Sequence, residues 1–329
     1  MVIMTLRLVA GALGAGSLGW AGGVTFQKYK DQQTSPSHSL LSAPGLPLRL
    51  PQVQAATAVV PASQDSGLVI PARDTGVPSE PRHDAPRVSQ IMRFGFPGLD
   101  HIRSHQDYIL SYDRRNRVPH WVFEHLTADG KRAEGVDRTK CEFKEDTSIH
   151  PYFRSRNSDY KYSGFDRGHM AAAGNHMSDQ TFMDETFLLT NMAPQVGRGF
   201  NRDKWEHLER YVRKQTRIYR NVYCCTGPLY LPRMEEDGKS YVKYQVIGQN
   251  NVAVPTHFFK VLVMETDGGE LELESFVLPN QEIPDSVPLD NFRVPPESVE
   301  RAAGLLFFDR VGRDKLAKIN GEKTSKGWF

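Results

Sequence analysis

The sequence predicts an α+β fold in which helices pack on a mixed or antiparallel sheet. Short segments rich in aliphatic and aromatic residues recur between residues 107 and 278, at the length of β-strands. One longer segment, residues 202–217, instead repeats its apolar residues at helical spacing. Because strands and helices do not alternate regularly, a parallel βαβ sheet is not favoured and an α+β arrangement is.

The first predicted strands form a hairpin. Residues 107–113 form one strand, residues 114–119 a polar turn and residues 120–126 the partner strand. The other short apolar segments are found at residues 187–191, 221–228, 244–248, 257–265 and 270–278.

Two helices are predicted. Residues 202–217 carry one inner stripe, made of Trp205, Leu208, Val212 and Gln215. Asn201 stands directly before this helix, where an N-cap is expected. A second helix begins at the Pro295-Pro296 pair and runs to about Leu305.

The amino-terminal region differs in composition from the rest of the chain. Residues 8–26 are uncharged, and as a helix they could just span a bilayer. A secretory signal, a membrane anchor and a mitochondrial presequence all fit this composition. Residues 32–88 are rich in Pro, Ser, Ala and Gln, so they bury little apolar surface and are predicted to be a disordered tether. The folded domain is expected at residues 89–329.

Charge is balanced over the whole chain but not locally. The formal net charge is only +2, so any polyanionic partner needs a local basic surface. Between residues 198 and 220 there are eight Lys or Arg and three Asp or Glu, a surplus of five positive charges. Part of this segment is expected to form helical ion pairs, Glu206 with Arg210 and Glu209 with Arg213. The three cysteines lack metal-ligand spacing, and Cys224 and Cys225, which are adjacent in an apolar run, are predicted to pack in the core.

A histidine motif carries the strongest chemical signal. His169 follows Asp166, Arg167 and Gly168. A neutral imidazole suits proton abstraction near neutral pH, and an arginine beside it can meet a phosphate. Gly168 removes a side chain, which would let a substrate backbone approach. The alternative is a simple Asp-Arg-Gly turn.

Two asparagines and a glutamate follow the histidine. Asn201 can either cap the helix or offer its amide oxygen to magnesium, an ion that keeps several waters and needs few protein ligands. Glu209 lies eight residues later, about 12 Å along a helix axis, so we expect it to hold a metal-bound water. Asn191 is the third candidate. Together these residue types suit phosphodiester hydrolysis. The sequence has no Cys-x-x-Cys pair, no Walker-type phosphate loop and no Gly-x-Ser-x-Gly elbow.

These motifs resemble the DNA/RNA non-specific endonucleases. The resemblance spans about residues 89–316, and its matching segments are residues 165–172, 175–176, 184–187, 191–195, 201–209, 244–248, 252–257 and 304–307. It implies a ββα-metal (His-Me finger) nuclease fold, a homodimer and one Mg²⁺, which Mn²⁺ could replace. By this resemblance His169 is the general base and Asn201 the metal ligand.

The same resemblance assigns the remaining site residues. Asn191 and Glu209 would support the catalytic site, and Arg138 would contact the phosphate. The candidate nucleic-acid contacts are Asp166, Arg167, Arg202 and Lys204. The implied activity is hydrolysis of DNA and RNA to 5′-phosphate and 3′-hydroxyl ends.

The resemblance is greatest to mitochondrial members of the family. It makes residues 1–31 a mitochondrial targeting segment, with transient inner-membrane association, residence in the intermembrane space and release to the nucleus during cell death. Gly174 matches an exonuclease-like branch, whereas the end of the chain soon after the shared core favours the endonucleases. Two other classes stay open: a nucleic-acid-binding protein without catalysis, and a membrane-tethered hydrolase of small phosphodiesters.

Overall fold

The computed structural model describes residues 86–98, 100–130 and 132–324. The predicted targeting segment and almost all of the predicted tether lie outside these residues. Helix α1 (Arg87–Ile91) begins two residues before the expected start of the domain. Its first residue, Arg87, forms an ion pair with Asp107 at 2.8 Å, so the folded domain includes it. None of the helices in the described ranges has the length and apolar character needed to cross a bilayer.

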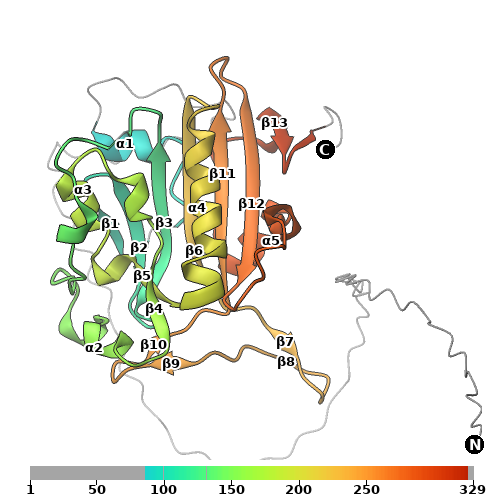
Figure 1. Ribbon diagram of the computed structural model, residues 1–329. Helices are drawn as coiled ribbons and strands as arrows, with labels where there is room; N and C mark the ends of the chain where they lie inside the picture. The colour runs from blue at the N-terminus through green and yellow to red at the C-terminus, as the bar shows by residue number, and fades with distance from the viewer. Residues whose placement is uncertain (1–85, 99, 131, 325–329) are drawn as a thin grey trace, which may run out of the picture. The chain divides into compact units, whose positions relative to one another are not determined.

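One large sheet forms the centre of the described domain (Figure 1). Its eight strands are arranged in the order β1-β2-β3-β6-β11-β12-β13-β14. Their bounds are β1 Ile102–Ser104, β2 Tyr108–Asp113, β3 Val118–Leu126, β6 Asn221–Leu229, β11 His257–Glu265, β12 Leu271–Pro279, β13 Leu316–Ile319 and β14 Glu322–Lys323. All neighbours are antiparallel except β12 and β13, which are parallel. The sheet is therefore mixed, and the α+β prediction is confirmed.

The central strand β6 shows why this sheet is covered on both sides. Every one of its residues is buried. Because successive side chains of a strand point to opposite faces, Cys224 packs in one apolar cluster and Cys225 in the other. Both cysteines are free and fully buried, so their predicted packing role is confirmed.

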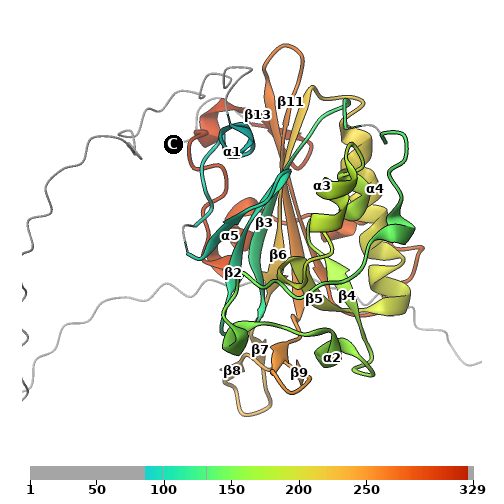
Figure 2. The ribbon, with the colours of Figure 1, turned by 90° about the vertical axis from the view of Figure 1, so that its left-hand side faces the viewer.

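The two faces of the sheet carry different elements (Figure 2). Helix α4 (Lys204–Gln215) and the short hairpin of β4 (Phe165–His169) and β5 (Met192–Val196) lie on one face. Helices α1 and α5 (Pro296–Ala303) lie on the other face. Helix α5 ends two residues earlier than predicted, because Gly304 takes a left-handed conformation with φ 68° and stops it.

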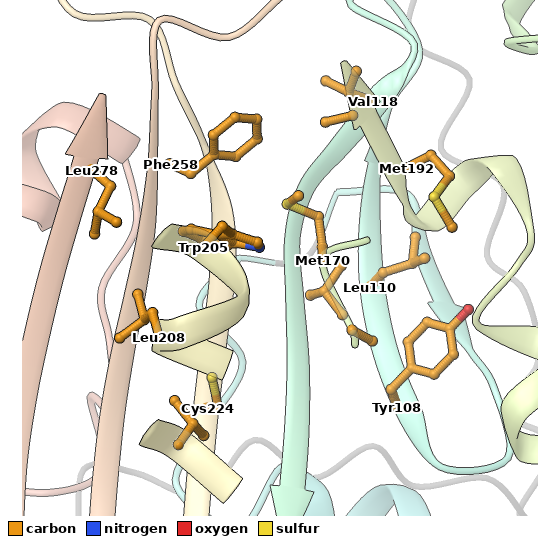
Figure 3. Close-up of a cluster of buried hydrophobic side chains, with 14 of the residues drawn as sticks. Tyr108, Leu110, Val118, Met170, Met192, Trp205, Leu208, Cys224, Phe258 and Leu278 are labelled. Carbon is orange, nitrogen blue, oxygen red and sulfur yellow. The ribbon is translucent and has the colours of Figure 1, made fainter. Parts of the chain in front are cut away.

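Helix α4 is held by the stripe that its sequence predicts. Trp205, Leu208, Val212 and Gln215 are all buried. In Figure 3, Trp205 and Leu208 point toward Phe258 and Leu278 of the sheet. The ring centroids of Trp205 and Phe258 are 5.5 Å apart. Removing the Trp205 ring would open a cavity between helix and sheet, at a typical cost of about 3–5 kcal/mol.

The turn before α4 differs from the prediction. Asn201 ends a π-helical turn, η5 (Gly197–Asn201), and the N-cap position of α4 belongs to Asp203. In this turn Gly199 has φ 80°, and a Cβ there would overlap Glu282. The turn points the Asn201 side chain to Asp166 of β4 at 2.9 Å. The expected capping role of Asn201 is therefore wrong.

The remaining elements are short. The helical ones are η1 Arg138–Lys140, η2 Pro151–Phe153, α2 Asn157–Tyr160, η3 Ala173–Asn175, α3 Gln180–Glu185, η4 Leu189–Asn191, η6 Leu289–Phe292 and η7 Arg313–Lys315. Two further hairpins pair β7 Arg233–Met234 with β8 Ser240–Tyr241, and β9 Val246–Ile247 with β10 Val252–Ala253. The apolar run at residues 187–191 thus ends in the turn η4, which leads directly into β5.

Candidate active site

The histidine motif forms a strand, which excludes the simple-turn alternative. In the β4–β5 hairpin, His169 pairs with Met192 and Gly168 with Ala193. A Cβ at Gly168 would overlap the side chain of Gln195. The missing side chain therefore makes room for Gln195, and not for a substrate backbone as the sequence suggested.

The hairpin, η5 and α4 enclose a cleft of about 1180 Å³. Seven of the nine residues predicted for the site line this cleft: Arg138, Asp166, Arg167, His169, Asn201, Arg202 and Glu209. They come from four separate elements and their flanking turns, so the fold assembles them from distant parts of the chain. Asn191 and Lys204 do not line the cleft.

His169 is poised as a proton acceptor. Its side chain is packed between Phe143 and Phe187, with ring centroids 5.7 and 4.8 Å away. Its Nε2 atom is buried and has no hydrogen-bond partner among the described residues. Burial, together with the positive charges of Arg138 and His176, lowers the pKa of His169 to about 3. The imidazole is therefore neutral at pH 7 and can accept a proton.

Asp166, two strand positions away from Gly168 in β4, connects this strand to Asn201 and Arg202 of the turn before α4. Its carboxylate accepts hydrogen bonds from Arg202 at 2.7 and 2.6 Å and from Asn201 at 2.9 Å. Burial by itself would raise the pKa of Asp166, but the bonds from Arg202 and Asn201 outweigh it, so this pKa is lowered. Asp166 is thus an ionised acceptor that orients Arg202 and Asn201.

Asn201 fits a hard cation such as magnesium. Its amide nitrogen donates to Asp166, while its Oδ1 atom has no hydrogen bond within the described chain. The described residues hold no group of three or more His, Cys, Asp or Glu that could bind a metal. An ion that retains most of its waters can still be held by one amide oxygen, with nearby carboxylates binding those waters.

Glu209 lies in the cleft, and the pKa of its carboxyl is raised. Burial raises the pKa of this carboxyl to about 7, against the opposing charges of Lys260 and Arg213. The predicted ion pair between Glu206 and Arg210 is present at 2.9 Å. The predicted pair of Glu209 with Arg213 is not. Arg213 instead binds the Asn175 side chain at 3.1 Å.

Two arginines of the cleft rest on aromatic rings. The guanidinium of Arg167 lies 4.4 Å from the ring centroid of Phe143 and donates to Asn157. The guanidinium of Arg138 lies 5.8 Å from the ring of Phe187. These contacts limit the motion of both cations while leaving them next to His169, where a phosphate could meet them.

Asn191 is fully buried, and its side chain forms hydrogen bonds with backbone groups of the described residues. Its Oδ1 accepts from the N–H of Ala171, and its Nδ2 donates to the carbonyls of Ala171 and Thr186, at 2.8–3.0 Å. A residue in this position cannot meet a substrate. Its hydrogen bonds hold the segment that follows His169, so direct catalysis does not fit this position, and the supporting role expected for Asn191 remains a prediction.

Lys204 is also corrected. Its side chain is 2% exposed, and its ammonium donates to the carbonyls of Asp285 and Val287 at 3.0 and 2.9 Å. It anchors a loop from inside the domain and is not open to nucleic acid. Periodicity would have placed it on the buried side of the helix, since it stands four residues before Leu208 of the inner stripe.

Several polar residues of the cleft were not among the predicted site residues. Arg213, Asn157 and Lys161 line the cleft with the expected set. For Arg213 a signal existed: Glu206, Glu209 and Arg213 are spaced by three and four residues, which places them on one helix face. For Asn157 and Lys161 the signal is absent, because they reach the cleft only through the fold of the α2 region.

An antiparallel hairpin followed by a helix, carrying the histidine and asparagine into one basic cleft, defines a nuclease of the ββα-metal (His-Me finger) class. The model of the DNA/RNA non-specific endonuclease family matches residues 87–314. The chain belongs to this family, which consists of metal-dependent nucleases.

Named relatives agree with the family. The chain is 48% identical to Caenorhabditis elegans "Endonuclease G, mitochondrial" over 297 residues, which cover 90% of this chain and 92% of the worm protein. It is 54% identical to the human protein of that name over 222 residues, 68% of this chain and 74% of the human one. A crystal structure of the EndoG/EndoGI complex matches with TM-score 0.73 and 65% identity, covering 74% of this chain and 99% of the solved chain.

Proposed function

We propose that the protein is a magnesium-dependent endonuclease that hydrolyses DNA and RNA to 5′-phosphate and 3′-hydroxyl ends. The observation that carries this proposal is the neutral His169, whose buried Nε2 lacks a partner in a cleft lined by arginines. A water that donates to this nitrogen would gain a proton acceptor beside cations that can hold a phosphate.

Each cleft residue has a proposed task. His169 takes the proton of the attacking water, and Arg138 and Arg167 hold the phosphate. Asp166 orients Arg202 and Asn201 through the hydrogen bonds described above. Asn201 would hold magnesium, or manganese in its place, with Glu209 binding a water of the ion. When bound, the ion supplies positive charge to the phosphate and the departing 3′ oxygen.

The charge around the cleft favours a polymer over a small phosphodiester. Arg202 and Arg210 are exposed on or beside α4, and their side chains can meet phosphates beyond the one being cleaved. A long substrate would then bind in a salt-dependent way, whereas a dinucleotide would lose these additional contacts.

The activity is tested with the full chain on closed circular plasmid, on linear DNA and on a dinucleotide, each with magnesium and with EDTA. Magnesium-dependent nicking of the circle is expected, with much weaker hydrolysis of the dinucleotide. Cleavage only from the ends of linear DNA would instead support an exonuclease. Salt-dependent binding without any cleavage would support a nucleic-acid-binding protein.

Asn201→Ala tests the metal ligand. This change removes the one amide oxygen available to the ion, so we expect half-maximal activity to need at least about tenfold more magnesium, the usual scale for weakening a metal site. Titration of nicking activity with magnesium and with manganese measures this effect. An exposed asparagine outside the cleft, Asn291, provides the matched control as Asn291→Ala. An unchanged metal titration would remove Asn201 as the ligand.

Lys204→Met tests whether Lys204 stabilises the domain from inside or contacts nucleic acid. Two buried carbonyls lose a charged donor, so we expect a loss of about 1–3 kcal/mol in the free energy of unfolding. The salt dependence of DNA binding should stay unchanged, since this ammonium meets no phosphate. Urea unfolding and binding titrations at several salt concentrations measure both quantities. Arg202→Met, on the exposed side of the cleft, is the comparison and should reduce the salt dependence. An equal reduction by Lys204→Met would return Lys204 to the interface.

The cellular setting is proposed from relatives named as mitochondrial proteins. We place the protein in mitochondria, with residues 1–31 as targeting segment, residence in the intermembrane space and transient association with the inner membrane. A homodimer and release to the nucleus during cell death, where it would degrade DNA, complete this proposal. Fractionation of mitochondria and gel filtration of the purified protein test these points.

A further inference from the structure

A chain of buried hydrogen bonds connects the cleft to the interior of the domain. It begins at Arg213, whose Nη1 donates to Oδ1 of Asn175 at 3.1 Å. Nδ2 of Asn175 donates to Oε1 of Glu124 in β3 at 2.7 Å. The same carboxylate oxygen meets Nε2 of His176 at 3.0 Å. On its other side, His176 meets Oδ2 of Asp107 through Nδ1 at 2.8 Å.

His176 is the charged centre of this chain. Its side chain is fully buried, and both ring nitrogens face carboxylates. An ionised carboxylate can only accept a hydrogen bond, so both nitrogens donate and the ring is an imidazolium. Burial would lower the pKa of His176, but the bonds to Asp107 and Glu124 outweigh it and raise this pKa to about 9. Oε2 of Glu124 is buried without a partner among the described residues, which makes the nearby positive charge more important.

This chain of hydrogen bonds is anchored in the sheet and not at the surface. Asp107 stands directly before β2 and is held from its other side by Arg87 of α1 at 2.8 Å. Glu124 belongs to β3 and is fully buried. Asn175 and His176 end the segment that follows His169, so the turn η3 is attached to two neighbouring strands of the sheet.

Arg213 needs such support because little else holds it. Its nearest carboxylate, Glu206, is 4.0 Å away. Gly174 leaves the space that the guanidinium occupies, since a Cβ there would lie 3.2 Å from Nη1. A long side chain that projects freely into a cleft would lose rotamer entropy on meeting a phosphate, and the bond to Asn175 removes part of that cost in advance.

We propose that His176 is a positioning residue of the nuclease site, which acts through Glu124 and Asn175 to hold Arg213 in the cleft. This inference rests on the proposed function, because it assumes that Arg213 meets the nucleic-acid substrate. His176 itself touches no substrate. Its bridge between Asp107 and Glu124 fixes Asn175, and Asn175 fixes the guanidinium.

A double-mutant cycle tests this coupling in the full-length protein. His176→Gln is measured in the wild-type background and in an Arg213→Ala background, by kcat and KM for magnesium-dependent plasmid cleavage. In the wild-type background we expect kcat/KM to fall about tenfold, the scale of coupling between residues in one network. In the Arg213→Ala background the same change should cost less than about twofold, because the residue it positions is gone.

Two further variants keep the test decisive. Asn175→Ala removes the bond to Arg213 but leaves His176 with both carboxylates. Its loss of kcat/KM should likewise depend on the presence of Arg213, so this variant takes the place of His176→Gln in the cycle if His176→Gln does not fold. His101→Gln makes the matched substitution at an exposed site and should match the wild type. Thermal unfolding of each variant shows that it is folded at the assay temperature.

The outcomes separate this inference from the proposed function. Equal losses in both backgrounds, or no loss in the wild-type background, would overturn the positioning role while leaving the nuclease assignment intact. Absence of magnesium-dependent cleavage by the wild-type protein would overturn the proposed function itself.

Discussion

Replacing His169 by alanine is expected to lower kcat for plasmid cleavage at least about a hundredfold, the usual scale for loss of a general base. The reason is local: a neutral imidazole with an unpartnered Nε2 stands in the cleft, between two aromatic rings. Binding of DNA should barely change, because the ring carries no charge at pH 7 and the cleft arginines remain.

Single-turnover cleavage and equilibrium binding of a duplex, each with the wild type and the variant, measure these two effects. His207→Ala is a suitable control, since His207 lies on α4 but does not line the cleft. A rate near that of the wild type in His169→Ala would show that another group activates the water. A loss of binding as large as the loss of rate would point to a misfolded cleft.

Asn191→Ala is expected to lower the free energy of unfolding by about 3 kcal/mol or more. Three buried backbone groups, the N–H and carbonyl of Ala171 and the carbonyl of Thr186, lose their partner together. Each unsatisfied group costs about 1–3 kcal/mol. Activity should fall as well, because the released segment directly follows His169. Figure 3 shows Met170 of this segment and Met192 of β5 in the buried hydrophobic cluster.

Urea unfolding followed by circular dichroism measures this loss. Asn191→Asp preserves the shape of the side chain but replaces the NH2 group, which donates to two carbonyls, by a carboxylate oxygen that can only accept. This variant should therefore be at least as destabilised as Asn191→Ala. Asn291→Ala, at an exposed position, should change stability by less than about 0.5 kcal/mol. A stability of Asn191→Ala within about 1 kcal/mol of the wild type would mean that water replaces the lost bonds.

Much of the sheet was predictable from the sequence. The segment 257–265 matches β11 in full, and the segments for β2, β3, β6 and β12 are shifted by at most two residues. Trp205 and Leu208 identified the inner face of α4 correctly. These features are local, since alternation and helical spacing record which side of an element is buried.

The predictions that differ from the structure concern side-chain direction. Asn201, Lys204 and Asn191 are polar residues whose role depends on where a turn directs the side chain. The turn η5 points Asn201 at Asp166, the start of α4 directs Lys204 inward, and η4 places Asn191 against Ala171. For Asn201 and Asn191, sequence spacing carries no information on such directions, whereas for Lys204 the helical spacing from Leu208 already indicated the buried side.

The sequence alone determined the class of fold, five of the eight strands of the large sheet and the helices α4 and α5, and it predicted His169 as base and Asn201 as metal ligand. Only the tertiary structure decided which polar residues share the cleft and which are buried supports, as it did for Arg213, Asn191 and the His176 bridge. The physical reason is that burial and hydrogen bonding are properties of groups brought together from distant parts of the chain. A periodic pattern reports the face of one element, whereas a site is formed by several.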